Sequence, residues 1–195
     1  TIREIHHRVK NNLQTVSALL RLQSRRSSEE AVKVALAEAE RRVQAIATVH
    51  AALSQNVDES VDFDEVARTI VRMAGAIAST DHSVEVITTG SFGTIQADQA
   101  QALATVLNEL VANSVEHGLA DRDGLIEVRA EREGTSMTVT VADNGVGFVP
   151  GTPMSGLGTQ IVHQMVRGEL KGSIEWAPRE GGGTLVTLHA NLDPA

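Results

Sequence analysis

The segment from Thr1 to Asn56 contains neither glycine nor proline, and this constrains the fold more than any other feature of the sequence. Apolar side chains recur in it at the three- and four-residue spacing of a helical face. They form two stripes, the first of Ile2, Ile5, Val9, Leu13, Val16 and Leu20 and the second of Val32, Leu36, Ala39, Val43, Ile46, Val49 and Leu53. Between the stripes, Ser27-Ser28-Glu29-Glu30 offers an N-cap hydroxyl followed by acidic residues, which predicts the start of a second helix.

Two helices with a short join form a hairpin, which we assign to residues 1–57. A hairpin alone leaves its apolar stripes half exposed, whereas two copies packed as a four-helix bundle would cover them. We therefore expect the protein to form a homodimer through this segment.

From Val61 onward the pattern changes to a mixture of helices and strands, after a linker at Val57–Ser60. Helices are expected at Phe63–Ala78, at Asp98–Leu119 with Asp98 as its cap, and near Thr159–Arg167, and strands at Ser83–Thr89, Leu125–Glu131, Met137–Ala142, Ser173–Trp176 and Thr184–His189. Runs of consecutive strands grouped with helices indicate an α+β domain over residues 61–195, with helices on one face of a largely antiparallel sheet.

Composition argues against several classes of protein. The net charge of −8 and an aromatic content of 2% argue against direct nucleic-acid binding. The chain has no cysteine and no apolar run of the roughly 20 residues that a bilayer-spanning helix requires, so we expect a cytoplasmic protein with no membrane segment in this fragment. We expect a fragment because the chain begins at Thr1 rather than at methionine.

The first helix is basic in an otherwise acidic chain and carries two adjacent histidines. Its basic residues are Arg3, Arg8, Lys10, Arg21, Arg25 and Arg26, which indicate either an anionic partner or a solvated coiled-coil face. On a helical wheel His6 flanks the apolar stripe, whereas His7 lies almost opposite it. A neutral, exposed imidazole is a competent nucleophile near pH 7, and Glu4 is a candidate for orienting its ring. The alternative is that His7 is an ordinary exposed histidine. A zinc site is a weaker alternative, because the residue four positions after His7 is Asn11, which is not a strong zinc ligand.

The run Glu-Ile-His-His-Arg-Val-Lys-Asn-Asn-Leu-Gln-Thr-Val-Ser-Ala-Leu-Leu-Arg-Leu-Gln, residues 4–23, resembles the phosphoacceptor motif of the HisKA-2 subfamily of sensor histidine kinases, relatives of the HWE group. The resemblance implies that His7, directly before Arg-Val-Lys-Asn, accepts the phosphate. Where the larger HisKA group has an acidic residue after this histidine, the present chain has Arg8. The general-base role of that acidic residue therefore cannot be carried over to Arg8. Glu4 stays only a candidate for orienting the His7 ring.

Three further motifs follow in order, and each is weak by itself. Leu107–His117 places Glu109, Asn113 and His117 along one helix face, which suits Mg²⁺ but is also typical of a solvated ridge. Asp143-Asn144-Gly145-Val146-Gly147 after a strand reads as a base-binding loop or as a plain turn. Gly156-Leu157-Gly158-Thr159 opens a helix whose free N–H groups favour phosphate.

Together these motifs resemble the N, G1 and G2 boxes of the GHKL ATPases, and Gly182-Gly183-Thr184 resembles the closing motif of that family. The resemblance implies a GHKL, or Bergerat, α/β sandwich in which Asn113 chelates Mg²⁺, Asp143 reads the adenine amino group and Glu109 activates the attacking group. The implied ATP contacts are Asn108, Asn113, His117, Asp143, Gly145, Gly147, Gly156, Leu157, Gly158 and Thr184. Before His117, where that family often has a basic residue, stands Glu116.

The two resemblances together imply a kinase that transfers the γ-phosphate of ATP to His7 and then to an aspartate on a response regulator receiver domain. A mobile lid is expected around Gly147–Gly158. The layout is most similar to actinobacterial cytosolic kinases paired with an ANTAR-type regulator. The alternatives are a GHKL ATPase or anti-sigma-type Ser/Thr kinase with the same pocket, and a pseudokinase that only dimerises and binds partners.

Overall fold

The computed structural model describes residues 1–78, 82–120, 122–151 and 156–194. Its helices are α1 (Ile2–Arg26), α2 (Glu30–Leu53), α3 (Phe63–Ala78), α4 (Ala97–Asn113), the π-helical turn η1 (Ser114–Gly118) and α5 (Leu157–Gly168). Its strands are β1 (Ser60–Asp62), β2 (Val84–Gly90), β3 (Thr94–Gln96), β4 (Gly124–Glu133), β5 (Ser136–Asp143), β6 (Ser173–Pro178) and β7 (Thr184–Asn191). Every helix in this described part of the chain is too short or too polar to cross a bilayer.

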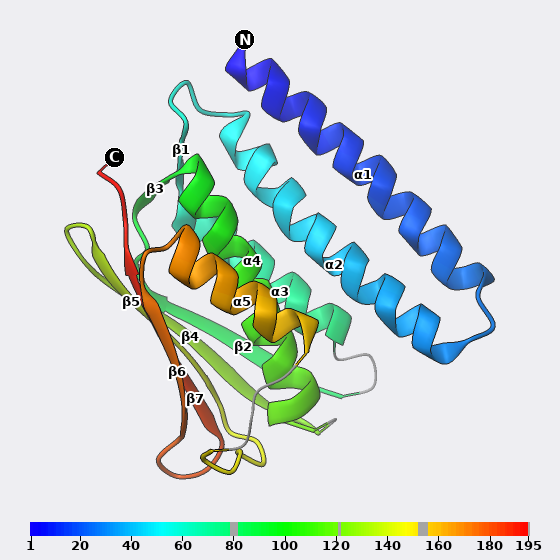
Figure 1. The fold of residues 1–195 in the computed structure, drawn as a ribbon, viewed down its shortest axis with the longest axis vertical. Helices are drawn as coiled ribbons and strands as arrows, with labels where there is room; N and C mark the ends of the chain where they lie inside the picture. The colour runs from blue at the N-terminus through cyan, green and yellow to red at the C-terminus, as the bar shows by residue number, and fades with distance from the viewer. Residues whose placement is uncertain (79–81, 121, 152–155, 195) are drawn as a thin grey trace.

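Helices α1 and α2 form the expected antiparallel hairpin (Figure 1). Contacts along its length fix their register: Nε2 of Gln44 donates to Oγ of Ser17 at 2.7 Å, and Nε of Arg3 donates to the carbonyl of Ser54 at 3.0 Å. Within α1, which is described completely, Ser17 is the only buried residue. The hairpin therefore keeps one side of α1 free of intrachain packing.

The second part is an α+β sandwich with a five-stranded sheet in the order β2-β4-β5-β7-β6. The β2–β4 pair is parallel and the remaining pairs are antiparallel, in agreement with the largely antiparallel sheet predicted. Helices α3, α4 and α5 cover one face of the sheet, and α2 lies over α4 on the side away from the sheet (Figure 1). The two short strands β1 and β3 pair with each other and were not predicted.

The core is continuous from the sheet through α4 to the end of α2. Its fully buried members include Phe63, Phe92, Leu103, Leu107 and Leu110. Because Val49 and Leu53 at the end of α2 belong to the same cluster, α2 packs in both the hairpin and the α+β sandwich.

Three predicted helix ends are corrected by the structure. Helix α2 begins at Glu30 after an N-cap at Glu29, because Ser27 remains extended as the C-cap of α1. Helix α4 begins at Ala97, and its N-cap is Gln96 rather than Asp98, because the N–H of Ala97 donates to the carbonyl of Glu59 at 2.9 Å beside β1. These starts are set by neighbouring chain segments and not by local capping residues.

The third correction is at the other end of α4. The predicted helix to Leu119 is α-helical only to Asn113 and then widens into η1, where the N–H of Leu119 donates to the carbonyl of Ser114 at 2.7 Å. Such π-helical turns occur often at functional sites. This one ends directly beside the cavity described next.

Candidate functional site

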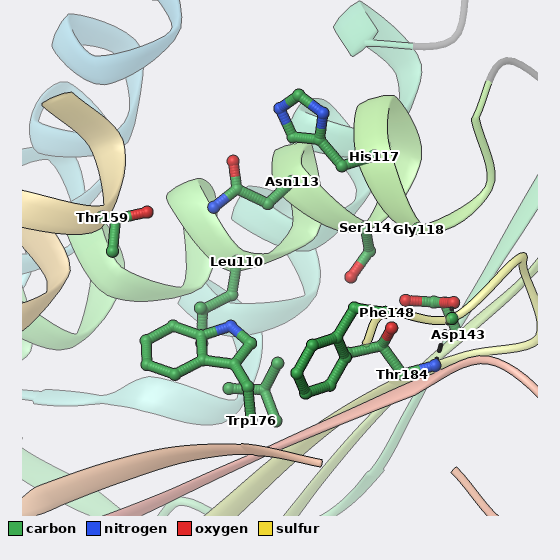
Figure 2. A pocket seen from close by; sticks show the side chains of 12 residues that line it. Leu110, Asn113, Ser114, His117, Gly118, Asp143, Phe148, Thr159, Trp176 and Thr184 are labelled. Atoms are coloured by element: carbon green, nitrogen blue, oxygen red, sulfur yellow. Dashed lines mark hydrogen bonds between the residues drawn. The ribbon is translucent and has the colours of Figure 1, made fainter. Parts of the chain in front are cut away.

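A cavity of ≈ 250 Å³ lies between the end of α4, the loop after β5, the start of α5 and the strands β6 and β7 (Figure 2). Its lining residues come from every motif that the sequence singled out in this half of the chain. They are Leu110, Asn113, Ser114, His117, Gly118, Asp143, Gly147, Phe148, Thr159, Trp176, Thr184 and Val186.

Of the predicted ATP contacts, five line this cavity: Asn113, His117, Asp143, Gly147 and Thr184. The others lie outside its lining. Gly145 packs against the carbonyl of Gly118. The start of α5 is formed by Gly156, Leu157 and Gly158. Asn108 is buried against α2, as is Glu109, which was predicted to be catalytic. The predicted lid falls partly on residues 152–155, which lie outside the described residues.

Asp143 is held at the end of β5 with one carboxylate oxygen in use and the other available. Its Oδ1 accepts from the backbone N–H groups of Gly145, at 3.0 Å, and Thr184, at 3.3 Å. Burial raises the pKa of Asp143 above its ordinary value, although these two hydrogen bonds and the nearby Arg179 act in the opposite direction. The free oxygen of a buried, oriented carboxylate is suited to accept a hydrogen bond from an amino group of a flat ligand.

Glycine is required where η1 meets Asp143. A β-carbon on Gly118 would collide with the Asp143 carboxylate, and a β-carbon on Gly145 would collide with the carbonyl oxygen of Gly118. The backbone N–H of Val146 donates to that same carbonyl at 2.8 Å. The loop after β5 is therefore fastened to η1, which fixes one wall of the cavity.

The lining side chains that were not predicted include Phe148, Trp176 and Ser114. Phe148 follows the last glycine of the Asp143 motif, Trp176 comes from β6, and Ser114 starts η1. Figure 2 shows the rings of Phe148 and Trp176 on one side of the cavity, facing Asn113 and His117 on the other. The alternating pattern of β6 could have indicated that Trp176 points inward, but only the fold shows what it faces.

Glu109 and Asn108 do not form part of an exposed ridge. Their side chains are buried beneath α2, where Nε of Arg42 donates to Oε1 of Glu109 at 2.6 Å. Nη1 of Arg41 lies 3.7 Å from the same oxygen and donates to the carbonyl of Asn108 at 3.2 Å. The pKa of Arg42 is raised by its hydrogen bond to Glu109. The packing of α2 on α4 encloses Asn108 and Glu109, and the pattern of apolar residues along α4 does not reveal that packing.

The two histidines of α1 differ as the helical wheel predicts: His7 is exposed and His6 is half-buried. Nδ1 of His6 lies 2.9 Å from Nδ1 of His50 on α2. The ring of His7 has Asn11 beside it, with the Asn11 amide 3.3 Å from Nδ1, whereas Glu4 accepts from Arg8 at 2.9 Å. Nε2 of His7 therefore faces away from the Asn11 contact.

His7 and the cavity lie at opposite ends of the molecule within one chain. His6 touches His50, and His50 hydrogen-bonds Gln101 near the start of α4, whereas Asn113 is at the end of that helix. Twelve residues of α-helix separate Gln101 from Asn113, which corresponds to about 18 Å. Figure 1 shows the N-terminus of α1 and η1 at these two ends.

The cavity offers few protein ligands for a metal ion. No cluster of three or more His, Asp or Glu side chains suited to a metal occurs among the described residues. The Asn113 side chain lines the cavity and is the one predicted ligand there. A single amide oxygen fits Mg²⁺, which takes one or two protein ligands and completes its shell with water and phosphate oxygens.

Comparisons with known proteins match two successive parts of the chain to two families. Residues 4–77 match the family described as histidine kinase, of the HisKA_2 type, and residues 98–194 match the family of histidine kinase-, DNA gyrase B- and HSP90-like ATPases. The fold and cavity thus define an ATPase domain of this type joined to a histidine-bearing helical hairpin.

Two curated relatives are similar over nearly the whole chain. The sensor histidine kinase PdtaS of Mycolicibacterium smegmatis is 46% identical over 98% of this chain and 40% of its own length. The blue-light-activated histidine kinase 2 of Erythrobacter litoralis is 27% identical over 97% of this chain and 56% of its own. The present chain therefore spans about two fifths of the length of the PdtaS relative.

The fold is also that of a solved kinase domain. The histidine kinase domain of the Erythrobacter litoralis EL346 blue-light-activated kinase superposes with a TM-score of 0.70 at 23% identity, covering 98% of this chain and 90% of that one. The chain belongs to the histidine kinases, with a HisKA_2 domain followed by an ATPase domain.

Proposed function

We propose that this chain is the catalytic region of a homodimeric, cytoplasmic sensor histidine kinase that phosphorylates itself on His7 and passes the phosphoryl group to an aspartate of a response regulator receiver domain. The observation that carries the proposal is the pairing of an exposed imidazole in a HisKA_2 helix with a cavity built around Asp143 and Asn113. Residues 1–57 would serve dimerisation and phosphotransfer, and residues 61–195 would bind ATP.

The cavity supports specific roles for its residues. Asp143, with Oδ1 already engaged, would accept from the adenine amino group, and the rings of Phe148 and Trp176 would flank the base. Asn113 would hold Mg²⁺, which neutralises phosphate charge in such reactions. The start of α5 at Gly156–Gly158 would receive the phosphates on its free N–H groups.

The chemistry at His7 follows from its exposure. Nε2 would attack the γ-phosphorus in line, forming an N–P bond while the bond to the β-phosphate oxygen breaks and ADP leaves with the electron pair. The proton on Nδ1 can then pass to solvent. Asn11, 3.3 Å from Nδ1, would keep that nitrogen engaged and Nε2 outward, the role for which the sequence makes Glu4 a candidate.

The separation of about 18 Å along α4 limits how transfer can occur. With α2 docked on α4 as it is here, His7 does not reach the cavity of its own chain. Transfer then requires either the cavity of the partner subunit or a rotation of the hairpin relative to the ATPase domain. A receiver domain would dock on the exposed surface around His7, and by likeness to actinobacterial kinases of this layout we propose that it belongs to an ANTAR-type regulator.

The proposal is tested by incubating the protein with Mg²⁺ and γ-³²P-ATP. We expect acid-labile label on the wild type and on His6→Gln, and none on His7→Gln. Adding candidate receiver domains should move the label to the receiver.

The outcomes separate the alternatives. Acid-stable label would indicate a Ser/Thr kinase, because phosphohistidine is acid-labile and phosphoserine is not. ATP hydrolysis without label would indicate a plain ATPase, and nucleotide binding without hydrolysis or label would indicate a pseudokinase. Label lost in His6→Gln but retained in His7→Gln would contradict the assignment of the acceptor.

A further inference from the structure

The contact between α2 and the ATPase domain contains a buried ion pair beside the start of α5. Arg42 makes two hydrogen bonds to Glu109, from Nε to Oε1 at 2.6 Å and from Nη2 to Oε2 at 3.4 Å. The Glu109 side chain is 2% exposed, whereas that of Arg42 is 19% exposed. Arg42 is thus the member of the pair that still has access to solvent.

This pair lies against the glycine loop that opens α5. A β-carbon on Gly158 would lie 2.5 Å from Oε2 of Glu109 and 3.7 Å from Nη2 of Arg42. The next residue, Thr159, lines the cavity, as does Asn113, one helical turn beyond Glu109. The Arg42 guanidinium therefore lies beside the first turn of α5, just outside the lining of the cavity, where the helix N–H groups favour phosphate.

Arg42 is surrounded by acidic side chains. Glu116 is half-buried nearby, and burial raises its pKa. Glu38, Glu109 and Glu116 all act on Arg42. In the structure, Arg42 is held by the carboxylates of Glu109 and Glu38. A triphosphate arriving at Gly158 would compete with them, because a guanidinium binds phosphate oxygens through paired hydrogen bonds.

We propose that Arg42 is a phosphate-binding residue of the ATP site, contributed by the hairpin helix α2, and that it exchanges Glu109 for the terminal phosphates when nucleotide binds. This inference rests on the proposed function. It links the two halves of the molecule: the same side chain that docks α2 on α4 would be drawn to ATP, and Glu109 would be released next to the phosphates.

The test measures nucleotide affinity through Trp176, which is the only tryptophan of the chain and lines the cavity. Arg42→Ala should raise the dissociation constant of ATP about tenfold or more, as expected for the loss of hydrogen bonds to a charged group. The constant for ADP should rise less, because ADP lacks the terminal phosphate. Arg42→Lys should retain part of the ATP affinity through its charge.

Glu109→Gln distinguishes phosphate binding from a purely structural ion pair. If Arg42 exchanges partners, weakening its bond to residue 109 should tighten ATP binding, and adding Arg42→Ala to Glu109→Gln should still lose affinity for ATP. If Arg42 only anchors Glu109, the double variant should bind ATP like Glu109→Gln alone. That result, or equal losses for ATP and ADP in Arg42→Ala, would overturn the proposal.

Matched controls separate this outcome from misfolding and from failure of the proposed function. Arg25→Ala removes an exposed arginine in the last turn of α1, outside the cavity lining, and should leave ATP affinity unchanged. Circular dichroism identifies variants that do not fold, and Arg42→Lys, which keeps the charge, provides the ATP-to-ADP comparison if Arg42→Ala is one of them. If the wild type itself binds no nucleotide, the proposed function fails first, whereas nucleotide binding with an unchanged Arg42→Ala rejects only the role of Arg42.

Discussion

The hairpin and the ATPase domain bury their apolar residues in different ways. In α4, Leu107 and Val111 are completely buried within a single chain. In α1, Ile5 is 60% exposed and Leu19 57% exposed, although both belong to an amphipathic helix. The ATPase domain is complete within one chain, whereas the hairpin has an apolar face that a second copy would cover.

The difference in burial corresponds to different requirements in the two parts of the molecule. A rigid core is needed where Asp143 and the glycine loops must hold a ligand in fixed geometry. If His7 is presented to another domain, as we propose, it has to stay in solvent, and the packing of α1 is then confined to its other sides. Helix α2 joins the two parts, with Val49 and Leu53 in the core and Arg42 beside Gly158 at the start of α5.

The largest expected effect is on the stability of the ATPase core. Leu107→Ala should destabilise it by about 2–5 kcal/mol, because it leaves a cavity in a fully buried site. Leu19→Ala, the same change on the exposed face of α1, should change the stability of this domain by less than about 0.5 kcal/mol. Urea unfolding followed by Trp176 emission measures both, and equal losses would show that the two parts do not differ as described.

A smaller effect is expected on association. Val16→Glu and Leu19→Glu should shift the protein from dimer to monomer, raising the dimer dissociation constant about tenfold or more, because they place charge on the apolar face of α1. The control Gln14→Glu adds the same charge at another exposed position of the helix. Sedimentation measures the assembly, and ATP binding by the monomeric variants should persist. A dimer that survives both changes would place the interface elsewhere.

The next prediction concerns pH and the ATPase half. Because burial raises the pKa of Asp143, acidification should protonate it at a higher pH than an ordinary aspartate. A protonated Asp143 is a poorer acceptor for an amino group, so ATP affinity should fall on acidification. The ratio of dissociation constants for the wild type and Asp143→Asn cancels the titration of the phosphates themselves. A ratio that does not vary with pH would contradict the role of the Asp143 charge.

The smallest effect is expected at the hairpin. Burial lowers the pKa of His50, and the neighbouring His6 lowers it further. The folded state therefore binds this proton less tightly than the unfolded chain, and its contribution to stability, present above the ordinary pKa, is lost as pH falls. The melting temperature of the hairpin should fall slightly as the pH is lowered from about 7 to about 5. His50→Gln should flatten this dependence, and an unchanged slope would assign it to other groups.

Much of the fold could be predicted from the sequence because its signals are local. The spacing of the apolar residues in α1 and α2 has the period of a helix, so both helices could be predicted directly. The bounds of α3 agree with the predicted Phe63–Ala78. Helix starts were predicted less well. Ala97 begins α4 because β1 and β3 pair beside it, and residues distant in sequence leave no local trace of such pairing.

For the candidate site too, some features could be predicted from the sequence and others could not. The sequence by itself determined which residue types are present: an outward His7 on a basic helix, and Asn113, Asp143 and Thr184 in ordered motifs that the fold brings to one cavity. Only the tertiary structure decided that Glu109 is buried in an ion pair with Arg42, that Trp176 faces the cavity, and that His7 lies at the far end of the same chain. Helical period specifies the face on which a side chain lies, whereas the side chain that meets it is set by packing between segments far apart in the chain.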